Sequence, residues 1–101
     1  MFYKSQLTKG FFSGGYTTGD VATADRTTYS TETTAAVPGA NLSLARRGLS
    51  AAGNADRAFF CGGIITSSDV ATADRTTYST ETTAAVSGAN LSVARGFLAA
   101  A

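Results

Sequence analysis

The chain has 101 residues, 44% of them apolar and 15% charged, a composition typical of a small folded domain and not of a disordered tail. A formal net charge of +1 provides no strong field of either sign, which argues against nucleic acid or an anionic membrane as the main partner. No stretch approaches the roughly 20 apolar residues of a transmembrane helix, and residues 1–9 lack the apolar core of a signal peptide.

One unit accounts for nearly the whole chain, because residues 20–52 recur as residues 69–101 with 28 of 33 aligned positions identical. The preceding residues repeat more loosely: FFSGG is matched by FFCGG, and one extra residue then restores the register. Such a slip is tolerated in a loop and not in a strand. A period of this length is typical of solenoids, propellers and arrays, whose units bury their apolar faces against one another. We expect a single repeat domain with units at about 10–57 and 58–101.

The units are expected to be all-β, since threonine-rich runs oppose helix formation and suit a pleated strand. In chain order, an aromatic strand at residues 10–13 ends in a glycine doublet, a threonine-rich strand spans 21–29, and a third spans 33–37. A long connection, PGANLSLAR, leads to a strand of small residues at 48–52, suited to a crowded inner position. The second unit repeats these four strands, at residues 58–61, 70–78, 82–86 and 97–101.

A helix over residues 41–52 is the alternative, because the apolar residues of this segment recur at helical spacing. Gly48 within it and Gly53 behind it oppose the helix, since glycine costs about 1 kcal/mol in a helix interior. We expect a connection and a strand instead. The glycine doublets are expected to have a structural role; they are Gly14, Gly15, Gly62 and Gly63.

The order of these features resembles the blade of a kelch-type β-propeller. An apolar run leads into a glycine doublet, a strand ends near a tyrosine, and an arginine precedes the strand of small residues. These residues are Tyr29 and Arg46 in one copy and Tyr78 and Arg95 in the other. Where a kelch blade carries a tryptophan on its outer strand, both copies have Ala-Ala. The repeat is most similar to the degenerate kelch-like repeats of phage and other viral structural proteins.

Two blades cannot close a propeller, which needs about four to eight. The chain begins with the aromatic strand of one blade and ends with the inner strand of another. The resemblance therefore implies that residues 97–101 of each chain complete the first blade of a neighbour, head to tail, in a ring or a filament. We predict a homo-oligomer, with a trimer of six blades favoured over a dimer or a tetramer. A fragment of a longer repeat protein and an engineered duplication are the alternatives.

Catalysis and metal binding are disfavoured by the residues that are missing. The chain has no histidine and a single cysteine, so it lacks the usual zinc, haem and Cys-His sites and cannot form an internal disulfide. Without histidine, a serine or cysteine nucleophile lacks its usual base. We expect no enzyme activity and no cofactor. Cys61 is expected to be a small buried residue, because Ser13 takes its place in the other copy.

A carbohydrate site is the alternative to a purely structural role, because a ring presents the same loops several times and gains avidity. Such a site requires aromatic platforms and planar polar groups. The candidates that recur with the unit are Tyr29, Tyr78, Arg26, Arg75, Arg46 and Arg95, and Tyr16 and Arg47 are added to them.

Each recurrent candidate also has a structural interpretation, and the same interpretation holds for the corresponding residue of the second unit. Tyr29 would pack within the blade with its hydroxyl at the solvent. Arg46 would bond carbonyl groups at the turn into the inner strand. Arg26 would pair with the preceding Asp25 at the surface of a strand edge. Asn41, in an Asn-Leu-Ser sequence, would form an Asx turn rather than a glycosylation site.

These expectations combine into a non-enzymatic, oligomeric β-propeller with a structural or adhesive role, on a viral particle or another extracellular assembly. Its partners would be further copies of itself, and beyond them a glycan or another structural protein. A sugar-binding propeller is the second hypothesis. In a lectin, tyrosines and arginines from adjacent blades would converge on one open pocket, whereas in a structural ring they would bond the neighbouring backbone.

Overall fold

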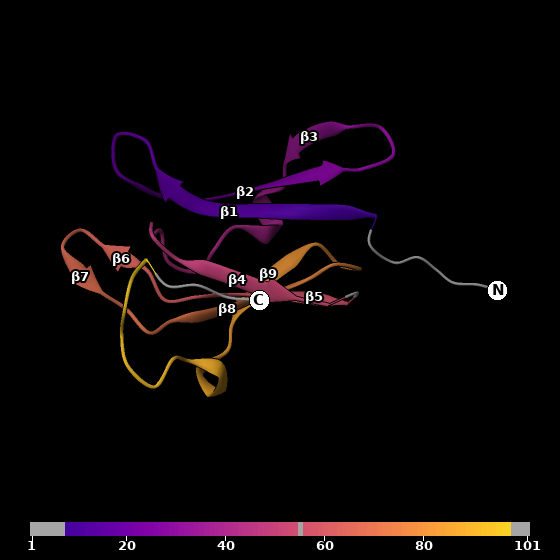
Figure 1. Ribbon diagram of the computed structural model, residues 1–101. Helices are drawn as coiled ribbons and strands as arrows, with labels where there is room; N and C mark the ends of the chain where they lie inside the picture. The colour runs from indigo at the N-terminus through magenta and orange to yellow at the C-terminus, as the bar shows by residue number, and fades with distance from the viewer. Residues whose placement is uncertain (1–7, 55, 98–101) are drawn as a thin grey trace.

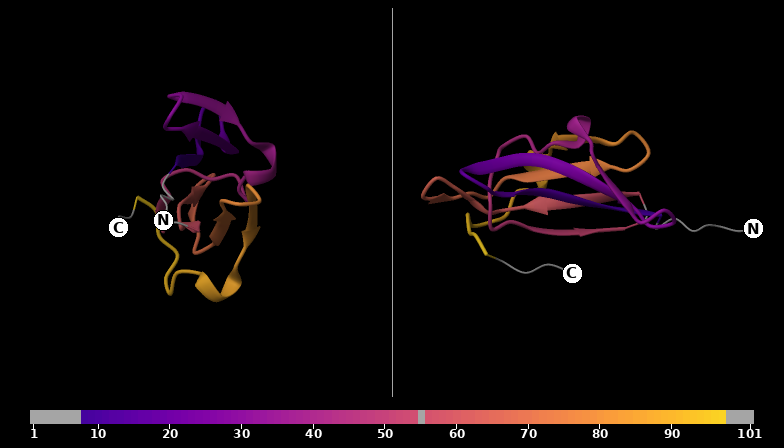
Figure 2. Two further views of the ribbon diagram at one scale, coloured as in Figure 1. Left: turned by 90° about the vertical axis from the view of Figure 1, so that its right-hand side faces the viewer. Right: turned by 90° about the horizontal axis from the view of Figure 1, so that it is seen from above.

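The computed structural model describes residues 8–54 and 56–97, which form an all-β molecule of two stacked sheets and one short hairpin (Figure 1). Two further views show the same two layers (Figure 2). The predicted all-β class is confirmed, and the described residues make two layers rather than a closed ring. No helix in the described part of the chain is long and apolar enough to cross a membrane.

The first sheet belongs to the first repeat unit and has the antiparallel order β1-β2-β3. Its strands are β1 (Lys9–Tyr16), β2 (Asp20–Thr28) and β3 (Thr33–Ala36). Threonines pair across β2 and β3, where the hydroxyl oxygens of Thr27 and Thr34 lie 2.7 Å apart. Among the described residues β1 pairs only with β2, so its other long edge has no strand neighbour.

The glycine doublet shifts the register between β1 and β2. Gly14 and Gly15 have φ angles of +79° and +118°, a region that residues with a side chain rarely adopt. The resulting bulge bends the strand at this point. Gly62 and Gly63 repeat this conformation directly after the corresponding strand of the second unit, with φ angles of +72° and +109°.

The second sheet has four strands in the order β4-β5-β8-β9. They are β4 (Ser50–Gly53), β5 (Arg57–Cys61), β8 (Ala73–Thr77) and β9 (Thr82–Ala85). Strand β4 is the last strand of the first unit, and it pairs with β5 as an edge strand of the second sheet. A hairpin that the sequence did not predict follows β5 and consists of β6 (Ile64–Ile65) and β7 (Ser68–Asp69).

The predicted strands within the described residues are all present, with ends displaced by at most three residues. The strand expected at residues 97–101 is the exception. Phe97 lies in a bend with a φ angle of +53°, and residues 98–101 lie outside the described part of the chain. The repeat therefore predicts strand positions well wherever the structure describes them.

The alternative helix over residues 41–52 is wrong. The connection begins with a single 3-10 turn, η1 (Pro38–Ala40), and then runs without regular structure to β4. Gly48 has a φ angle of +66°, which lies outside the helical region.

The connection of each unit is held on the central threonine-rich strand of the same unit, β2 or β8. The side-chain oxygen of Asn41 accepts a hydrogen bond from the backbone N–H of Ala24 at 3.1 Å. Asn90, after the 3-10 turn η2 (Ser87–Ala89), accepts the same bond from Ala73 at 3.0 Å. The Asx turns expected at these asparagines are therefore wrong, because each amide bonds a residue 17 positions away.

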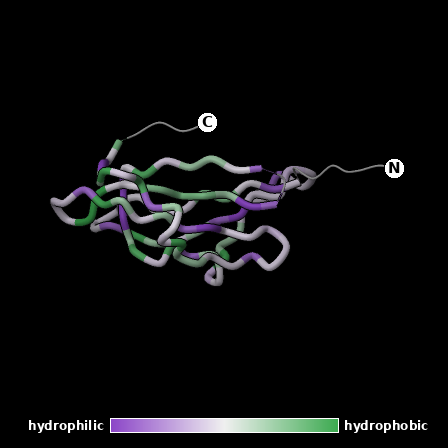
Figure 3. Tube along the Cα trace, turned by 90° about the horizontal axis from the view of Figure 1, so that it is seen from below, coloured by the Kyte–Doolittle hydropathy of each residue, from purple (hydrophilic) through white to green (hydrophobic). Residues whose placement is uncertain are grey.

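The apolar core lies between the two sheets. Its buried members are Leu42 from the connection and Ala58 and Phe60 from β5, with exposed fractions of 5%, 8% and 4%. Phe11 of β1 packs against them, and its ring stacks on that of Tyr78 at a centroid distance of 5.8 Å. Polar and apolar positions are interspersed along the chain (Figure 3), so each sheet buries its apolar residues against the other.

Candidate functional site

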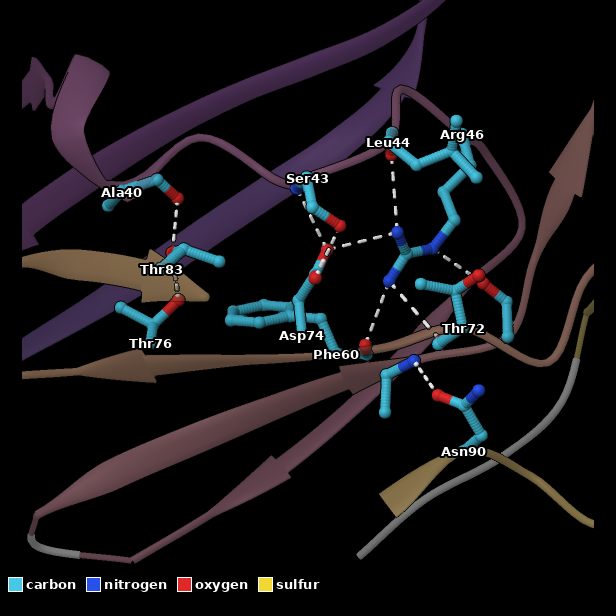
Figure 4. Close-up of polar contacts among 12 residues, drawn as sticks. Ala40, Ser43, Leu44, Arg46, Phe60, Thr72, Asp74, Thr76, Thr83 and Asn90 are labelled. Carbon is cyan, nitrogen blue, oxygen red and sulfur yellow. Dashed lines mark hydrogen bonds and ion pairs between the residues drawn. The ribbon is translucent and has the colours of Figure 1, made fainter. Parts of the chain in front are cut away.

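A fully buried arginine, Arg46, occupies the junction between the two sheets (Figure 4). It lies at the end of the first unit's connection, and its guanidinium reaches the second sheet. Its Nε donates to the carbonyl oxygen of Gly62 at 2.7 Å, and Nη2 donates to that of Phe60 at 2.9 Å. Nη1 donates to the carbonyl of Leu44 at 3.2 Å and to the carboxylate of Asp74 at 3.1 Å. Arg46 therefore bonds carbonyl groups, as expected, but most of them belong to the second unit.

The carboxylate of Asp74, on β8, is also completely buried. Its Oδ2 accepts hydrogen bonds from Arg46 and from the backbone N–H of Ser43 at 3.0 Å. Its Oδ1 accepts a bond from the Ser43 hydroxyl at 2.6 Å. A buried ion pair is tolerated when both charges are well hydrogen-bonded, and it then favours one specific arrangement. These bonds therefore determine how the first unit's connection docks on the second sheet.

The surface ion pairs expected within the Asp-Arg dipeptides, Asp25-Arg26 and its repeat, are wrong. Successive side chains of a strand point to opposite faces of the sheet, so neighbours cannot pair in this way. Asp74 faces Arg46, whereas Arg26 crosses the junction to Glu81. The arginine that neutralises Asp74 lies 28 positions away in the chain, so no local pattern indicates it.

Glu81 of the second unit forms a second, more exposed part of the junction. Its Oε2 accepts hydrogen bonds from Arg26 and from Nζ of Lys9, the latter at 3.1 Å. The bond from Arg26, and after it that from Lys9, lowers the pKa of Glu81. Nearby, the hydroxyl of Thr83 donates to the carbonyl oxygen of Ala40 at 2.6 Å. Cations of the first unit thus face an anion of the second.

Arg47 makes contacts that the second unit cannot repeat, because Gly96 takes its place there. Its guanidinium donates to Asp20 Oδ1 at 2.7 Å and to the carbonyl oxygen of Thr66 at 3.0 Å. The backbone N–H of Thr66, which donates to Asp20, and then Arg47 lower the pKa of that carboxyl. The guanidinium also lies 5.1 Å from the centre of the Tyr16 ring. Tyr16 and Arg47 therefore contact each other.

The six recurrent candidates for a carbohydrate site do not meet in one pocket. Arg46 bonds buried carbonyls, and Tyr78 packs in the core, where burial raises the pKa of its hydroxyl. Tyr29 is 52% exposed at the far end of the first sheet, Arg75 is half-buried and Arg95 is exposed. Of the six, Arg46, Arg26 and Tyr78 bond or pack against the other unit.

The first sheet carries the corresponding residues, but they are more exposed than those of the second sheet. Phe12 and Asp25 lie opposite each other in β1 and β2, as Phe60 and Asp74 do in β5 and β8. Phe60 is 4% exposed, whereas Phe12 is 65% exposed. We call the surface defined by Phe12, Asp25 and Glu32 the open face.

A hollow of about 540 Å³ lies between the open face and β4. Phe12, Gly14 and Asp25 line it from the first sheet, and Ser50 and Ala51 line it from β4. Val21, Thr23 and Asp25 of β2 also line the hollow, so it lies over the face of β1 and β2 that carries Phe12. None of the six carbohydrate candidates lines it.

Cys61 is half-buried rather than fully buried, and burial raises the pKa of its thiol. At the corresponding position the first unit has Ser13, whose buried hydroxyl oxygen has no hydrogen-bond partner among the described residues. Ser13 also lines the hollow beside β1. Positions 13 and 61 thus differ both in the residue that occupies them and in its surroundings.

Sequence reasoning missed two residues of this hydrogen-bond network. Asp74, which accepts from Arg46, and Ser43, which donates to Asp74, were not among the candidates, although both recur in the other unit. Their recurrence could have indicated them, because a polar residue that is present in both units can make the same contact with the next unit each time. The chain matches no protein-family model, and no curated protein similar to it was found.

Proposed function

We propose that the protein is a non-enzymatic assembly unit that joins copies of itself head to tail into a β-propeller-like ring with a structural or adhesive role. One observation carries the proposal. The second sheet receives both its inner strand, β4, and its buried arginine from the unit that precedes it, whereas the described residues supply neither to the first sheet. We propose that a second copy of the chain supplies the corresponding strand and arginine to the first sheet.

The free edge of β1 supports the exchange of an inner strand. An edge strand presents unpaired N–H and C=O groups, which proteins usually cover or pair. The sequence LAAA at residues 98–101 repeats LSAA at residues 49–52, and the latter includes most of β4. The small side chains of either sequence would fit beside β1, next to the hollow. Other proteins bind an extended segment of a partner at an exposed sheet edge in this way.

The number of chains depends on ring closure. A head-to-tail contact repeats the same rotation until it closes a ring or continues as a filament. Known propellers have about four to eight blades, and two, three or four chains of two units each would supply such a number. We favour three chains. In this role the protein would be a component of a viral particle or another extracellular assembly, which is the setting that its kelch-like repeat suggests.

The mass of the intact chain in solution tests this proposal. Light scattering at several concentrations is expected to give about three times the chain mass of 10.3 kDa. A chain that lacks residues 97–101 is expected to remain a folded monomer, because its two sheets are built without them. An intact chain that stays monomeric at every concentration, or a shortened chain that keeps the full oligomer mass, would contradict the proposal.

A further inference from the structure

We propose that the open face is a receptor for the guanidinium of Arg95 from a second copy of the chain. Arg95 would bond Asp25 there in the way that Arg46 bonds Asp74 inside one chain. The inference rests on the proposed function, because it assigns the side chains that determine the head-to-tail contact.

The acceptor groups of the open face match those around Arg46. In the second sheet, the guanidinium is held by the Asp74 carboxylate and by the carbonyl oxygens of Phe60 and Gly62. The corresponding residues of the first sheet are Asp25, Phe12 and Gly14, and all three line the hollow beside β1. Gly14 and Gly62 share a positive φ angle, +79° and +72°, so the backbone follows the same path at this point.

The donor is held in the same backbone frame as Arg46. The N–H of Arg46 donates to the carbonyl of Val21 at 3.2 Å, and that of Arg95 donates to the carbonyl of Val70 at 3.3 Å. The carbonyl oxygens of both arginines accept a bond of 2.9 Å from a glycine of the doublet in their own unit. Arg46 is buried, whereas Arg95 is exposed and its guanidinium bonds no described residue.

Ser92 completes the donor in the same way. It corresponds to Ser43, whose N–H and hydroxyl both donate to Asp74. Ser92 is exposed, and it precedes Arg95 by three residues, as Ser43 precedes Arg46. The second unit therefore presents a guanidinium, a hydroxyl and an N–H, and the first unit presents a carboxylate that accepts no side-chain hydrogen bond from the described residues.

The charges around the two surfaces are also complementary. Glu32 of the open face corresponds to Glu81, and both residues have a φ angle of +55°. Arg57 and Arg75 of the second sheet correspond to Lys9 and Arg26, which bind Glu81 within the chain. A second copy would thus bring two cations to Glu32. Opposite charges arranged in this way select one partner and one orientation.

The contact is heterologous, so each chain has one donor end and one acceptor end. Loss of either partner would leave the other charge buried and unpaired in the assembly. We expect such a change to weaken association on the order of 100-fold or more. A chain whose Arg95 is replaced can still bind the Arg95 of another chain through its Asp25. A chain whose Asp25 is replaced can still insert its Arg95 into another chain.

Two charge-reversed chains, Arg95→Glu and Asp25→Lys, test the proposal. Each variant alone is expected to be monomeric, because the side chains at positions 95 and 25 then carry charges of the same sign and repel each other. Mixed in equal amounts, they are expected to associate into oligomers in which the two kinds of chain alternate, measured by light scattering, because both contacts between unlike chains join opposite charges. The intact Arg95 of one chain then binds the intact Asp25 of the other.

The control is Asp56→Lys, which makes the same charge reversal at an exposed residue outside both surfaces; it is expected to keep the oligomer of the unchanged chain. If a reversal prevents folding, Arg95→Gln and Asp25→Asn preserve the size of each side chain and repeat the test. Variants that keep the oligomer mass of the unchanged chain would overturn this inference and leave the proposed function standing. An unchanged chain that is monomeric at every concentration would overturn both.

Discussion

The two repeat units have nearly the same sequence and very different surroundings. Phe60 is 4% exposed and its counterpart Phe12 is 65% exposed, although each lies two residues before a glycine doublet. Arg46 is buried and fully hydrogen-bonded, whereas Arg95 is exposed. The difference shows that the local sequence determines the strands and the connection, and that the neighbouring unit determines which side chains are buried. Substitutions made in parallel at equivalent positions measure this difference directly.

The largest contrast is expected between Arg46→Ala and Arg95→Ala. Arg46→Ala leaves Asp74 buried without its cation, which should lower the free energy of unfolding by about 3–5 kcal/mol. Arg95→Ala removes an exposed side chain, so at a protein concentration where the chain is monomeric its effect should stay within about 0.5 kcal/mol. Urea unfolding followed by circular dichroism measures both. Equal losses would show that the junction is not held by the buried pair.

A comparable contrast is expected for Phe60→Ala and Phe12→Ala. Phe60 lies in the core between the sheets, and truncating a buried phenylalanine costs about 3–5 kcal/mol. Phe12→Ala should change the stability of the monomer by less than about 1 kcal/mol, because Phe12 is mostly exposed. The same unfolding experiment, repeated at rising protein concentration, should show Phe12→Ala becoming costly as chains associate. A penalty for Phe12→Ala that never depends on concentration would argue against a covered open face.

The glycine doublets offer a smaller contrast. Gly63 and Gly15 both have positive φ angles, so replacing either by alanine should cost about 1–3 kcal/mol in backbone strain. At Gly63 an added Cβ would also lie 2.7 Å from the carbonyl oxygen of Arg47, whereas at Gly15 it would meet no atom within 4 Å. Gly63→Ala should therefore have the lower melting temperature. The reverse order would contradict this account of the junction.

The smallest effect is expected from Glu81. The ion pairs with Arg26 and Lys9 lower the pKa of Glu81, so their contribution is present at neutral pH and is lost as the pH falls through that lowered value. The pair is partly exposed, which limits the contribution to less than about 1 kcal/mol. Glu81→Gln should reduce the loss of stability between neutral pH and pH values below 4, and Glu32→Gln should not do so in the monomer. Melting temperatures across this range compare the two variants.

Sequence reasoning located the strands because their signals are local. Threonine runs, aromatic pairs and glycine doublets act within a few residues, and repetition presented each of them twice. The same reasoning misassigned Asp74 and Asn41, since it sought their partners among adjacent residues. Both have partners at least 17 positions away, on another strand or in another unit.

The sequence by itself determined that the chain is all-β, that its unit is repeated, and where the strands of each unit lie. The order of the strands already implied that the strand of small residues joins the next unit, as β4 does with β5, and only the tertiary structure decided that Arg46 reaches the second sheet to meet Asp74. The physical reason is that equivalent residues occur in both units, so their sequence cannot distinguish a covered face from an open one. Burial depends on which surface lies opposite, and that surface is fixed by contacts between residues that are distant in the chain.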